Sequence, residues 1–238
     1  MWDIMAIIKD YMKSSNFQDF INRRYKDNYE RTCPLNIFKV IGTDDVLFYL
    51  DDLVPSIEGA YADYKTDNLK STDIVLDIGA CIGGFSLRVC KNVKHVYAVE
   101  PIVTERLKQN IQLNKIKNIT VLNYALGYNN AIPFSKTNYF LNTYHNGKKL
   151  ECKTLSEIID LCGGHIDYLK LDCEGAEWLI TLEEFKKIKT IEAEIHSFKG
   201  MPKLKIFEKM LIDAGFEYER EDLDKSAMII HAKNKYTQ

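Results

Sequence analysis

From residue 74 onward, two patterns of hydrophobic positions alternate along the chain. Short, nearly continuous apolar runs predict buried strands, at 74–78, 95–99, 119–124, 168–171 and 190–195. Between these runs, apolar residues that recur every three or four positions predict helices, at 85–92, 104–114, 155–161 and 204–214. This alternation is typical of an α/β fold with a doubly wound, mostly parallel sheet.

Two further apolar runs near the C-terminus, 216–220 and 227–232, flank a charged turn. We expect them to pair antiparallel at one edge of the sheet. The polar segment 128–149 interrupts the alternation, and it predicts only a short strand near 131–134 followed by a loop.

The N-terminal part of the chain follows a different pattern. Residues 2–30 place apolar side chains at helical spacing among charges, which predicts one or two amphipathic helices. Two short strands around a Gly-Thr-Asp-Asp turn are predicted within 36–50, and a helix is predicted at 57–69. We therefore expect a helical extension with a short β-hairpin at residues 1–55 and a main domain at residues 56–238. The pattern leaves open whether the N-terminal helices pack on that domain, cover a substrate or form a homodimer.

The composition fits a single globular domain, because 46% of the 238 residues are apolar and 28% are charged. The net charge of -2 provides no general basic field, which weighs against a nucleic acid partner. Six cysteines without CxxC spacing are typical of a reduced, intracellular protein. The first residues lack a signal-peptide core, and no apolar stretch is long enough to span a bilayer. We therefore predict a cytoplasmic protein.

The loop at 77–85 follows the first strand of the alternation, where sheets of this kind bind ligands. Gly79 and Gly83 allow the backbone to turn sharply and to approach a ligand. Their Gly-x-x-x-Gly-Gly spacing differs from the Gly-x-Gly-x-x-Gly of dinucleotide sites. A carboxylate at Asp77 suits the ammonium group of an amino-acid tail and repels a pyrophosphate. The loop therefore favours S-adenosylmethionine (SAM) over a dinucleotide.

Acidic and polar residues after the next two predicted strands complete this expected nucleoside site. Glu100 ends the second strand, where an acid can accept hydrogen bonds from both ribose hydroxyls. Asn123 and Ala125 close the third strand, where the backbone can contact adenine. The predicted cofactor-binding residues are Asp77, Gly79, Ala80, Cys81, Gly83, Phe85, Glu100, Pro101, Asn123, Ala125 and Asp172.

The turn at 170–177 carries three carboxylates, which would repel one another unless they are solvated, paired with Lys170 or used on a ligand. Alternatively, Asp172 or Glu174 caps the following helix. Nothing in the spacing demands a metal, and we predict none. If these oxygens bound a metal together with Glu194 and His196, they would suit Mg²⁺ or Ca²⁺ better than Zn²⁺.

Alternation along the predicted strand at 190–195 places Glu192, Glu194 and His196 on one side. A histidine is a plausible general base, although a structural role is equally compatible with the sequence. His145, in the polar segment, is a second candidate. The predicted catalytic residues are Asp172, Glu174, Glu194 and His196. The base among them is His196, assisted by Glu194, or else Asp172.

Taken together, these motifs resemble the FkbM-type family of SAM-dependent methyltransferases. The matching residues lie within 57–196, at 76–80, Gly83, Phe85, 99–101, 125–127, 154–155 and above all 170–177. The resemblance implies a class I methyltransferase, Rossmann-like fold, whose seven-stranded sheet has an antiparallel final strand. It also implies O-methylation of a hydroxyl on a carbohydrate or other small molecule. Cys81 replaces a frequent asparagine, and residues 1–55 and 128–149 match no pattern.

Three alternative functions remain open. Methylation of RNA, such as tRNA, would require a basic face around Lys199, Lys203 and Lys205. A dinucleotide-linked oxidoreductase is disfavoured by the spacing of the glycine loop. A SAM-binding subunit without catalysis would not need the intact set of Asp77, Glu100 and Asp172.

Overall fold

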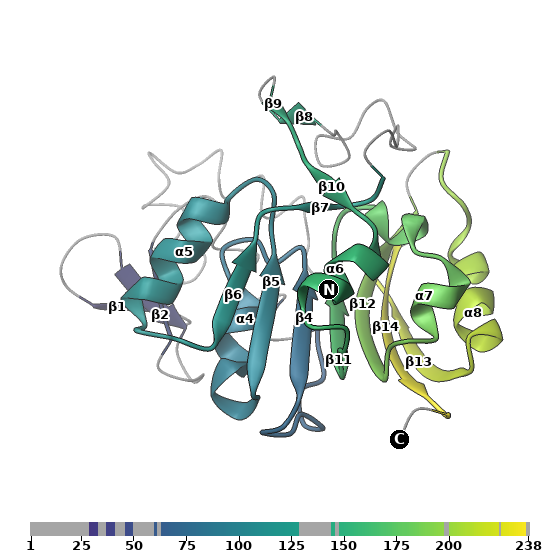
Figure 1. The fold of residues 1–238 in the computed structure, drawn as a ribbon, viewed down its shortest axis with the longest axis horizontal. Coiled ribbons are helices and arrows are strands. Elements are labelled where there is room, and N and C mark those ends of the chain that lie inside the picture. The colour runs from purple at the N-terminus through teal and green to yellow at the C-terminus, as the bar shows by residue number, and fades with distance from the viewer. Residues whose placement is uncertain are drawn as a thin grey trace.

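A seven-stranded sheet runs through the centre of the computed structural model (Figure 1). The structure describes residues 29–32, 37–40, 46–49, 60, 63–128, 144–145, 148–197, 200–223 and 225–236. The strands of the central sheet are β4 (Ile74–Ile78), β5 (His95–Val99), β6 (Ile119–Leu122), β11 (Tyr168–Leu171), β12 (Thr190–His196), β13 (Phe216–Asp222) and β14 (Ala227–Asn234).

The strand order in this sheet is β13-β14-β12-β11-β4-β5-β6. Strand β14 pairs antiparallel with both β12 and β13, whereas the pairs among β12, β11, β4, β5 and β6 are parallel. The predicted doubly wound sheet, its antiparallel final strand and the antiparallel pair at one edge are therefore confirmed. The carboxyl ends of β4, β5, β6, β11 and β12 share one edge of the sheet, which we call the carboxyl edge.

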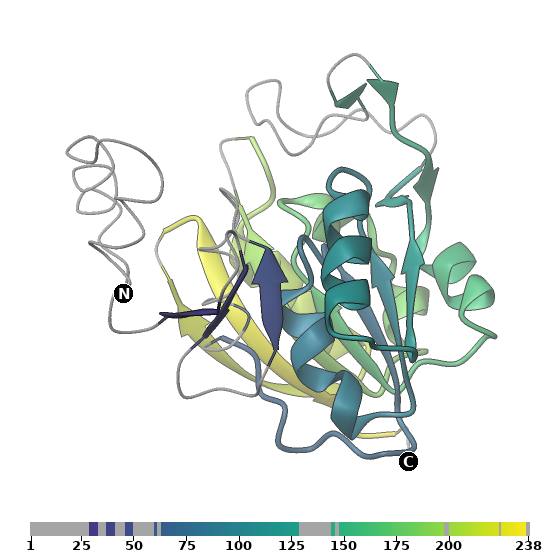
Figure 2. The ribbon, with the colours of Figure 1, turned by 90° about the vertical axis from the view of Figure 1, so that its left-hand side faces the viewer.

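Helices cover both faces of the sheet (Figures 1 and 2). They are α4 (Gly84–Val89), α5 (Thr104–Leu113), α6 (Leu155–Leu161), α7 (Leu182–Phe185) and α8 (Leu204–Asp213), with short 3₁₀ turns at Cys90–Asn92 and Ala176–Leu179. Apolar residues of α6, α7 and α8 form one core cluster with the sheet, and those of α4 and α5 contribute to two others. The predicted positions of α4, α5, α6 and α8 are confirmed to within a few residues.

An antiparallel three-stranded sheet precedes the central one, formed by β1 (Tyr29–Thr32), β2 (Ile37–Val40) and β3 (Leu47–Tyr49). The predicted hairpin of β2 and β3 is confirmed. The backbone of β3 bonds to the side chains of Asn110 and Asn114 on α5. The predicted helices within 2–30 lie outside the described residues, except that residues 29 and 30 belong to β1.

The predicted helix at 57–69 is wrong in its second half. Ala60 is helical, but residues 63–64 form a bend and residues 67–68 a turn. The backbone of Lys65 is bonded instead to side chains of the central sheet. Its N–H donates to Glu192 over 3.0 Å, and its carbonyl accepts from the Tyr168 hydroxyl over 2.7 Å. These bonds hold the segment 63–66 against the sheet and compete with helix formation.

Two small strand pairs complete the described fold. Strand β7 (Ala125–Leu126) pairs parallel with β10 (Cys152–Lys153), and β8 (Tyr144–His145) pairs antiparallel with β9 (Lys148–Lys149). The strand predicted near 131–134 lies outside the described residues. Within the described part of the chain, no helix combines the length and the hydropathy that crossing a membrane requires.

Candidate active site

The loop after β4 turns at two glycines with left-handed backbone, Gly79 (φ +79°) and Gly83 (φ +100°). A Cβ added to Gly79 would lie 1.7 Å from the carbonyl oxygen of Asp172. A Cβ added to Gly83 would lie 2.3 Å from the Leu87 side chain. A Cβ at Gly79 would thus meet backbone, and a Cβ at Gly83 would meet side-chain ends, so packing as well as the sharp turn favours glycine at both positions.

We predict that Gly79→Ala costs more stability than Gly163→Ala. Gly163 has a similar φ of +89°, but its added Cβ would meet nothing within 4 Å. This control therefore carries only the cost of alanine in left-handed backbone, about 1–2 kcal/mol. Displacing the Asp172 backbone should add about 1–3 kcal/mol to Gly79→Ala. Urea unfolding of the two variants measures the difference, and equal costs would contradict the packing explanation.

Asp77 is fully buried, and its carboxylate is engaged inside the protein. Its Oδ2 accepts a hydrogen bond of 2.6 Å from the Ser86 hydroxyl, and its Oδ1 lies 3.5 Å from Nζ of Lys170. Burial raises the pKa of Asp77, and the nearby Lys170 ammonium opposes that rise. The carboxylate does not lie at the mouth of the loop, where we expected it to meet an ammonium group. Asp77 instead contacts Ser86 and Lys170 inside the protein, beneath the surface of the loop.

Ala80 and Phe85, also predicted to contact the cofactor, are only 4% and 2% exposed. The Phe85 ring stacks on Tyr168 and meets Tyr64 edge-on, with centroid distances of 5.8 and 5.7 Å. It belongs to the core cluster beneath α4, because the first turn of this helix faces the sheet. Phe85 therefore packs in the core, which corrects its prediction as a ligand contact.

Glu100, directly after β5, joins two loops at the carboxyl edge. Its Oε1 accepts hydrogen bonds from the N–H groups of Ile102 and Val103, over 2.6 and 3.0 Å. Its Oε2 accepts one from Cys81 over 3.0 Å. Burial raises the pKa of Glu100, and these three bonds partly lower it. A carboxylate oxygen has two acceptor sites, so Oε2 retains one that fits a ribose hydroxyl.

The remaining predicted cofactor positions are accessible at the same edge. Cys81, Pro101 and Ala125 are partly exposed, and Asn123 is exposed. The Asn123 Oδ1 lies 3.1 Å from the Thr104 hydroxyl at the start of α5. Cys81, Pro101 and Asn123 follow β4, β5 and β6, so they lie with Glu100 at the carboxyl edge. This set fits a nucleoside in the position where such sheets bind ligands.

Lys170 was not among the predicted site residues, although it lies between two of them, Asp77 and Asp172. Its side chain is 4% exposed, and Nζ donates a 2.9 Å hydrogen bond to the carbonyl of Gly79. The same nitrogen lies 3.5 Å from Asp77 Oδ1 and 3.4 Å from Asp172 Oδ2. Burial alone would lower the pKa of Lys170, but Asp172 and Asp77 raise it above its ordinary value. One buried cation thus links the glycine loop to the turn after β11.

Tyr64 and Asp63, from the segment predicted as helix, also reach the site. The Tyr64 hydroxyl donates a 3.1 Å hydrogen bond to Asp172 Oδ2. Burial, together with the charges of Glu194 and Asp172, raises the pKa of Asp63 to about 6. No sequence pattern pointed to these two residues, because their position depends on the bonds that hold segment 63–66 on the sheet.

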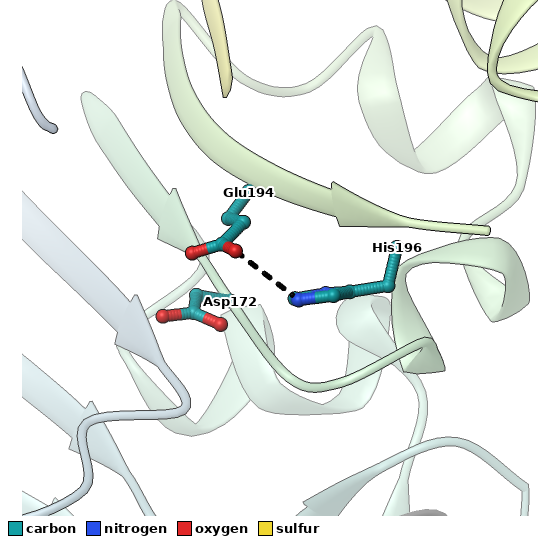
Figure 3. Close-up of side chains that lie close together, drawn as sticks. All are labelled: Asp172, Glu194 and His196. Carbon is teal, nitrogen blue, oxygen red and sulfur yellow. Dashed lines mark ion pairs between the residues drawn. The ribbon is translucent and has the colours of Figure 1, made fainter. Parts of the chain in front are cut away.

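Four carboxylates surround His196 at the ends of β11 and β12, and we call these five residues the acidic cluster: Asp172, Glu174, Glu177, Glu194 and His196. Figure 3 shows Asp172 and Glu194 beside the His196 ring. The His196 Nε2 lies 3.2 Å from Glu194 Oε1 and 3.7 Å from Glu174 Oε2. On the other side of the ring, Nδ1 lies 3.9 Å from Glu177 Oε1. The structure thus brings together all four residues predicted as catalytic.

The cluster determines the charge of the His196 imidazole. Burial by itself would lower the pKa of His196, but its interactions with Glu177 and Glu194 raise it to about 11. The carboxylates therefore favour the protonated imidazole, which does not favour the hypothesis that His196 is the general base. Burial and the neighbouring carboxylates raise the pKa of Glu174 to about 7, against the opposing effect of His196.

The alternative that Asp172 or Glu174 caps the next helix is not supported. The 3₁₀ turn Ala176–Leu179 has Gly175 at its N-cap and no side-chain hydrogen bond there. Glu177, within that turn, accepts a 2.8 Å hydrogen bond from the N–H of Cys173. The acids at positions 172 and 174 therefore have no capping role. His145 lies in β8. This strand belongs to a separate two-stranded sheet with β9, whereas β11 and β12, which carry the acidic cluster, belong to the central sheet.

A family model and several solved structures match this chain. The family model described as the methyltransferase FkbM domain matches residues 77–218, from the loop after β4 through the acidic cluster to β13. Solved structures with a similar chain path include M. jannaschii TYW2 in complex with AdoMet, at 17% identity over 85% of this chain and 88% of that chain, with a TM-score of 0.48. An rRNA methylase from Streptococcus thermophilus matches at 9% identity over 78% and 97% of the two chains, with a TM-score of 0.47.

The family match covers more than half of the 238 residues, including Glu100 and the whole of the acidic cluster. The order and direction of the strands in the central sheet agree with it. The chain therefore belongs to the methyltransferase FkbM family, and S-adenosylmethionine is its cofactor.

Proposed function

We propose that this protein transfers the methyl group of SAM to a hydroxyl oxygen of a carbohydrate or another small molecule. The observation that carries the proposal is the acidic cluster beside the cofactor loop. Asp172, which belongs to the cluster, follows β11, and β11 pairs directly with β4, the strand that ends in that loop. This position, at the edge where sheets of this kind bind ligands, supports an acceptor site at the cluster.

The accessible part of the cluster is anionic. The side chains of Asp172, Glu174 and Glu194 are 28%, 38% and 23% exposed. The two basic side chains here, Lys170 beside the cluster and His196 within it, are only 4% and 8% exposed. An acceptor therefore approaches carboxylate oxygens, which attract hydroxyl hydrogens and repel phosphates. This charge supports a sugar or a small alcohol over RNA.

SAM supplies a methyl group on a positively charged sulfur, which is a good leaving group. In the reaction the acceptor oxygen forms a bond to the methyl carbon, the carbon–sulfur bond breaks, and its electron pair stays on the sulfur. The hydroxyl proton must pass to a base within hydrogen-bond reach. The task of the protein is to align the acceptor and to hold that base in place.

Glu174 is the residue that we assign as the base. It has the most exposed side chain among Asp172, Glu174 and Glu194. Its φ of +57° is costly for a residue other than glycine, and strained backbone of this kind gathers at functional sites. Asp172 is already bonded to Tyr64 and Lys170, and Glu194 lies against the His196 ring. Those two carboxylates are positioned to orient the acceptor.

We expect Glu174→Gln to lower turnover by about 10²–10⁴-fold, the usual contribution of a general base. The amide keeps the size and the backbone angle of the wild-type residue, so SAM affinity and stability should change little. Turnover is measured as formation of S-adenosylhomocysteine with a saturating acceptor. Glu183→Gln, on the exposed surface of α7, is the control and should retain wild-type turnover. Equal turnover in all three proteins would contradict the assignment of Glu174.

The acceptor class is tested by incubating the protein with methyl-labelled SAM and a fractionated cell extract. We expect label in carbohydrate or small-molecule fractions. Label that enters RNA and is released by ribonuclease would contradict the proposal and favour RNA methylation. Absence of transfer to every fraction, despite SAM binding, would favour a SAM-binding subunit without catalysis.

A further inference from the structure

Three side chains of the acidic cluster lie within the range of one metal ion. One oxygen of Asp172, one oxygen of Glu194 and one ring nitrogen of His196 are all within 4.8 Å of one another. Figure 3 shows the three groups converging from the ends of β11 and β12. We propose that Asp172, Glu194 and His196 bind a divalent cation next to the methyl-transfer site.

The His196 ring is held as a metal ligand would be. Its side chain is 8% exposed, and its backbone carbonyl accepts a 2.6 Å hydrogen bond from the Trp178 indole. Nε2 points toward Glu194, whereas Nδ1 faces Glu177 at 3.9 Å. In metal sites, the ring nitrogen that does not bind the ion usually faces a carboxylate or a carbonyl. Glu177 occupies that outer position behind His196.

Glu177 is an independent sign that the cluster needs a further partner. Its side chain is fully buried, and its Oε2 has no hydrogen-bond partner among the described residues. A buried carboxylate without a full set of partners is costly. A cation that replaces the Nε2 proton of His196 would leave one hydrogen on Nδ1, on the side that faces Glu177, so that Glu177 would gain a donor.

The Asp172 carboxylate is also oriented by neighbouring side chains. Its Oδ2 accepts from the Tyr64 hydroxyl and lies 3.4 Å from Lys170 Nζ. These contacts fix the carboxylate plane and leave the second oxygen for a ligand. Glu194 and His196 alternate on β12, so both side chains project from the same face of that strand. Each of the three ligands is thus fixed by its strand or by neighbours that do not bind the ion.

The ligand types indicate which cation fits. Carboxylates suit Mg²⁺, Ca²⁺ and Mn²⁺, whereas an imidazole suits transition metals. Two carboxylates with one imidazole favour Mn²⁺ over Mg²⁺. Because Asp172 and Glu194 are partly exposed, coordination positions stay open toward solvent. If the proposed function holds, on which this role rests, the acceptor oxygen would take one of them.

This inference differs from the sequence-based prediction that the site contains no metal. The ligands are separated by more than twenty positions, from 172 to 194 and 196, which matches no local metal motif. Only the pairing of β11 with β12 places them side by side.

A titration of the metal-free, full-length protein with Mn²⁺, followed by electron paramagnetic resonance of the free ion, tests the site. We expect one bound Mn²⁺ per chain in the wild type and an affinity at least about tenfold lower in Glu194→Gln and in His196→Gln. His165→Gln removes an exposed imidazole that pairs with Asp167, and it should bind Mn²⁺ like the wild type. Failure of the wild type to bind, or equal binding by all variants, would overturn the site.

A second measurement needs no variant and so does not depend on its folding. Pulsed electron paramagnetic resonance of the wild type with Mn²⁺ should detect one imidazole nitrogen bound to the ion. A bound ion without nitrogen coupling would overturn the role of His196. Mn²⁺ binding with this coupling, but without methyl transfer to hydroxyls, would support the metal site and contradict the proposed function. Hydroxyl methylation by a protein that binds no Mn²⁺ would support the proposed function and contradict the metal site.

Discussion

Replacing Lys170 with methionine should lower the free energy of unfolding by about 3–5 kcal/mol, the usual cost of leaving a buried charge without its partner. Methionine is close to lysine in length, so the variant removes the charge and leaves little cavity. Asp77 is fully buried and, among the described residues, would keep the Ser86 hydroxyl as its one side-chain partner. Gly79 would also lose the ammonium group that its carbonyl binds. Urea unfolding at neutral pH measures the loss.

The pH dependence of this loss identifies its cause. Without Lys170, the pKa of Asp77 should rise further above its ordinary value of 3.8. A raised pKa means that the folded state binds more protons than the unfolded chain, so stability falls as pH increases above about 4. The penalty of Lys170→Met should therefore shrink in acid, and adding Asp77→Asn should recover part of it at neutral pH. Lys186→Met, which removes a surface ion pair, should cost less than about 1 kcal/mol. Equal costs for the two lysines would contradict the linking role of Lys170.

Replacing Glu100 with glutamine should weaken SAM binding by about 10–150-fold, because hydrogen bonds to a charged group contribute about 1.5–3 kcal/mol. Glu100 accepts from three backbone N–H groups, of Cys81, Ile102 and Val103. A glutamine amide would place its own N–H groups against one of these donors. The loops around the nucleoside would then separate, and a ribose hydroxyl would lose its charged acceptor.

Isothermal titration with SAM measures the loss of affinity for Glu100→Gln. Glu105→Gln is a matched control, because Glu105 lies on α5 and, within the part of the chain that the structure describes, pairs with the exposed Lys108. It should bind SAM like the wild type. An unchanged affinity in Glu100→Gln would contradict the role of this carboxylate in the cofactor site.

The sequence predicted those features that depend on local pattern. The run Tyr-Leu-Lys-Leu predicted β11, and all four of its residues are buried, Lys170 included. Glu100 was found because an acid after the second strand has a fixed place in sheets of this type. The capping box of Thr154 and Glu157 likewise marks the start of α6 where the pattern predicted it.

Features that depend on pairing between distant segments were not predictable in the same way. Lys170 reaches Asp77 because β11 and β4 pair with these two residues in register. Tyr64 reaches Asp172 because side chains of the central sheet compete for the backbone of Lys65. Phe85 was misassigned because its place at the start of a helix does not reveal which way that helix faces.

The central claim is that the methyl group of SAM reaches a hydroxyl oxygen, and the chemical shift of the transferred carbon tests it most directly. The protein is incubated with SAM that carries a ¹³C-labelled methyl group and with the extract fraction that accepts label. The purified product is then examined by ¹³C NMR. We predict a methyl carbon bonded to oxygen in a carbohydrate or another small molecule. A methyl carbon bonded to nitrogen or carbon, or any methylated nucleotide, would contradict the proposed function.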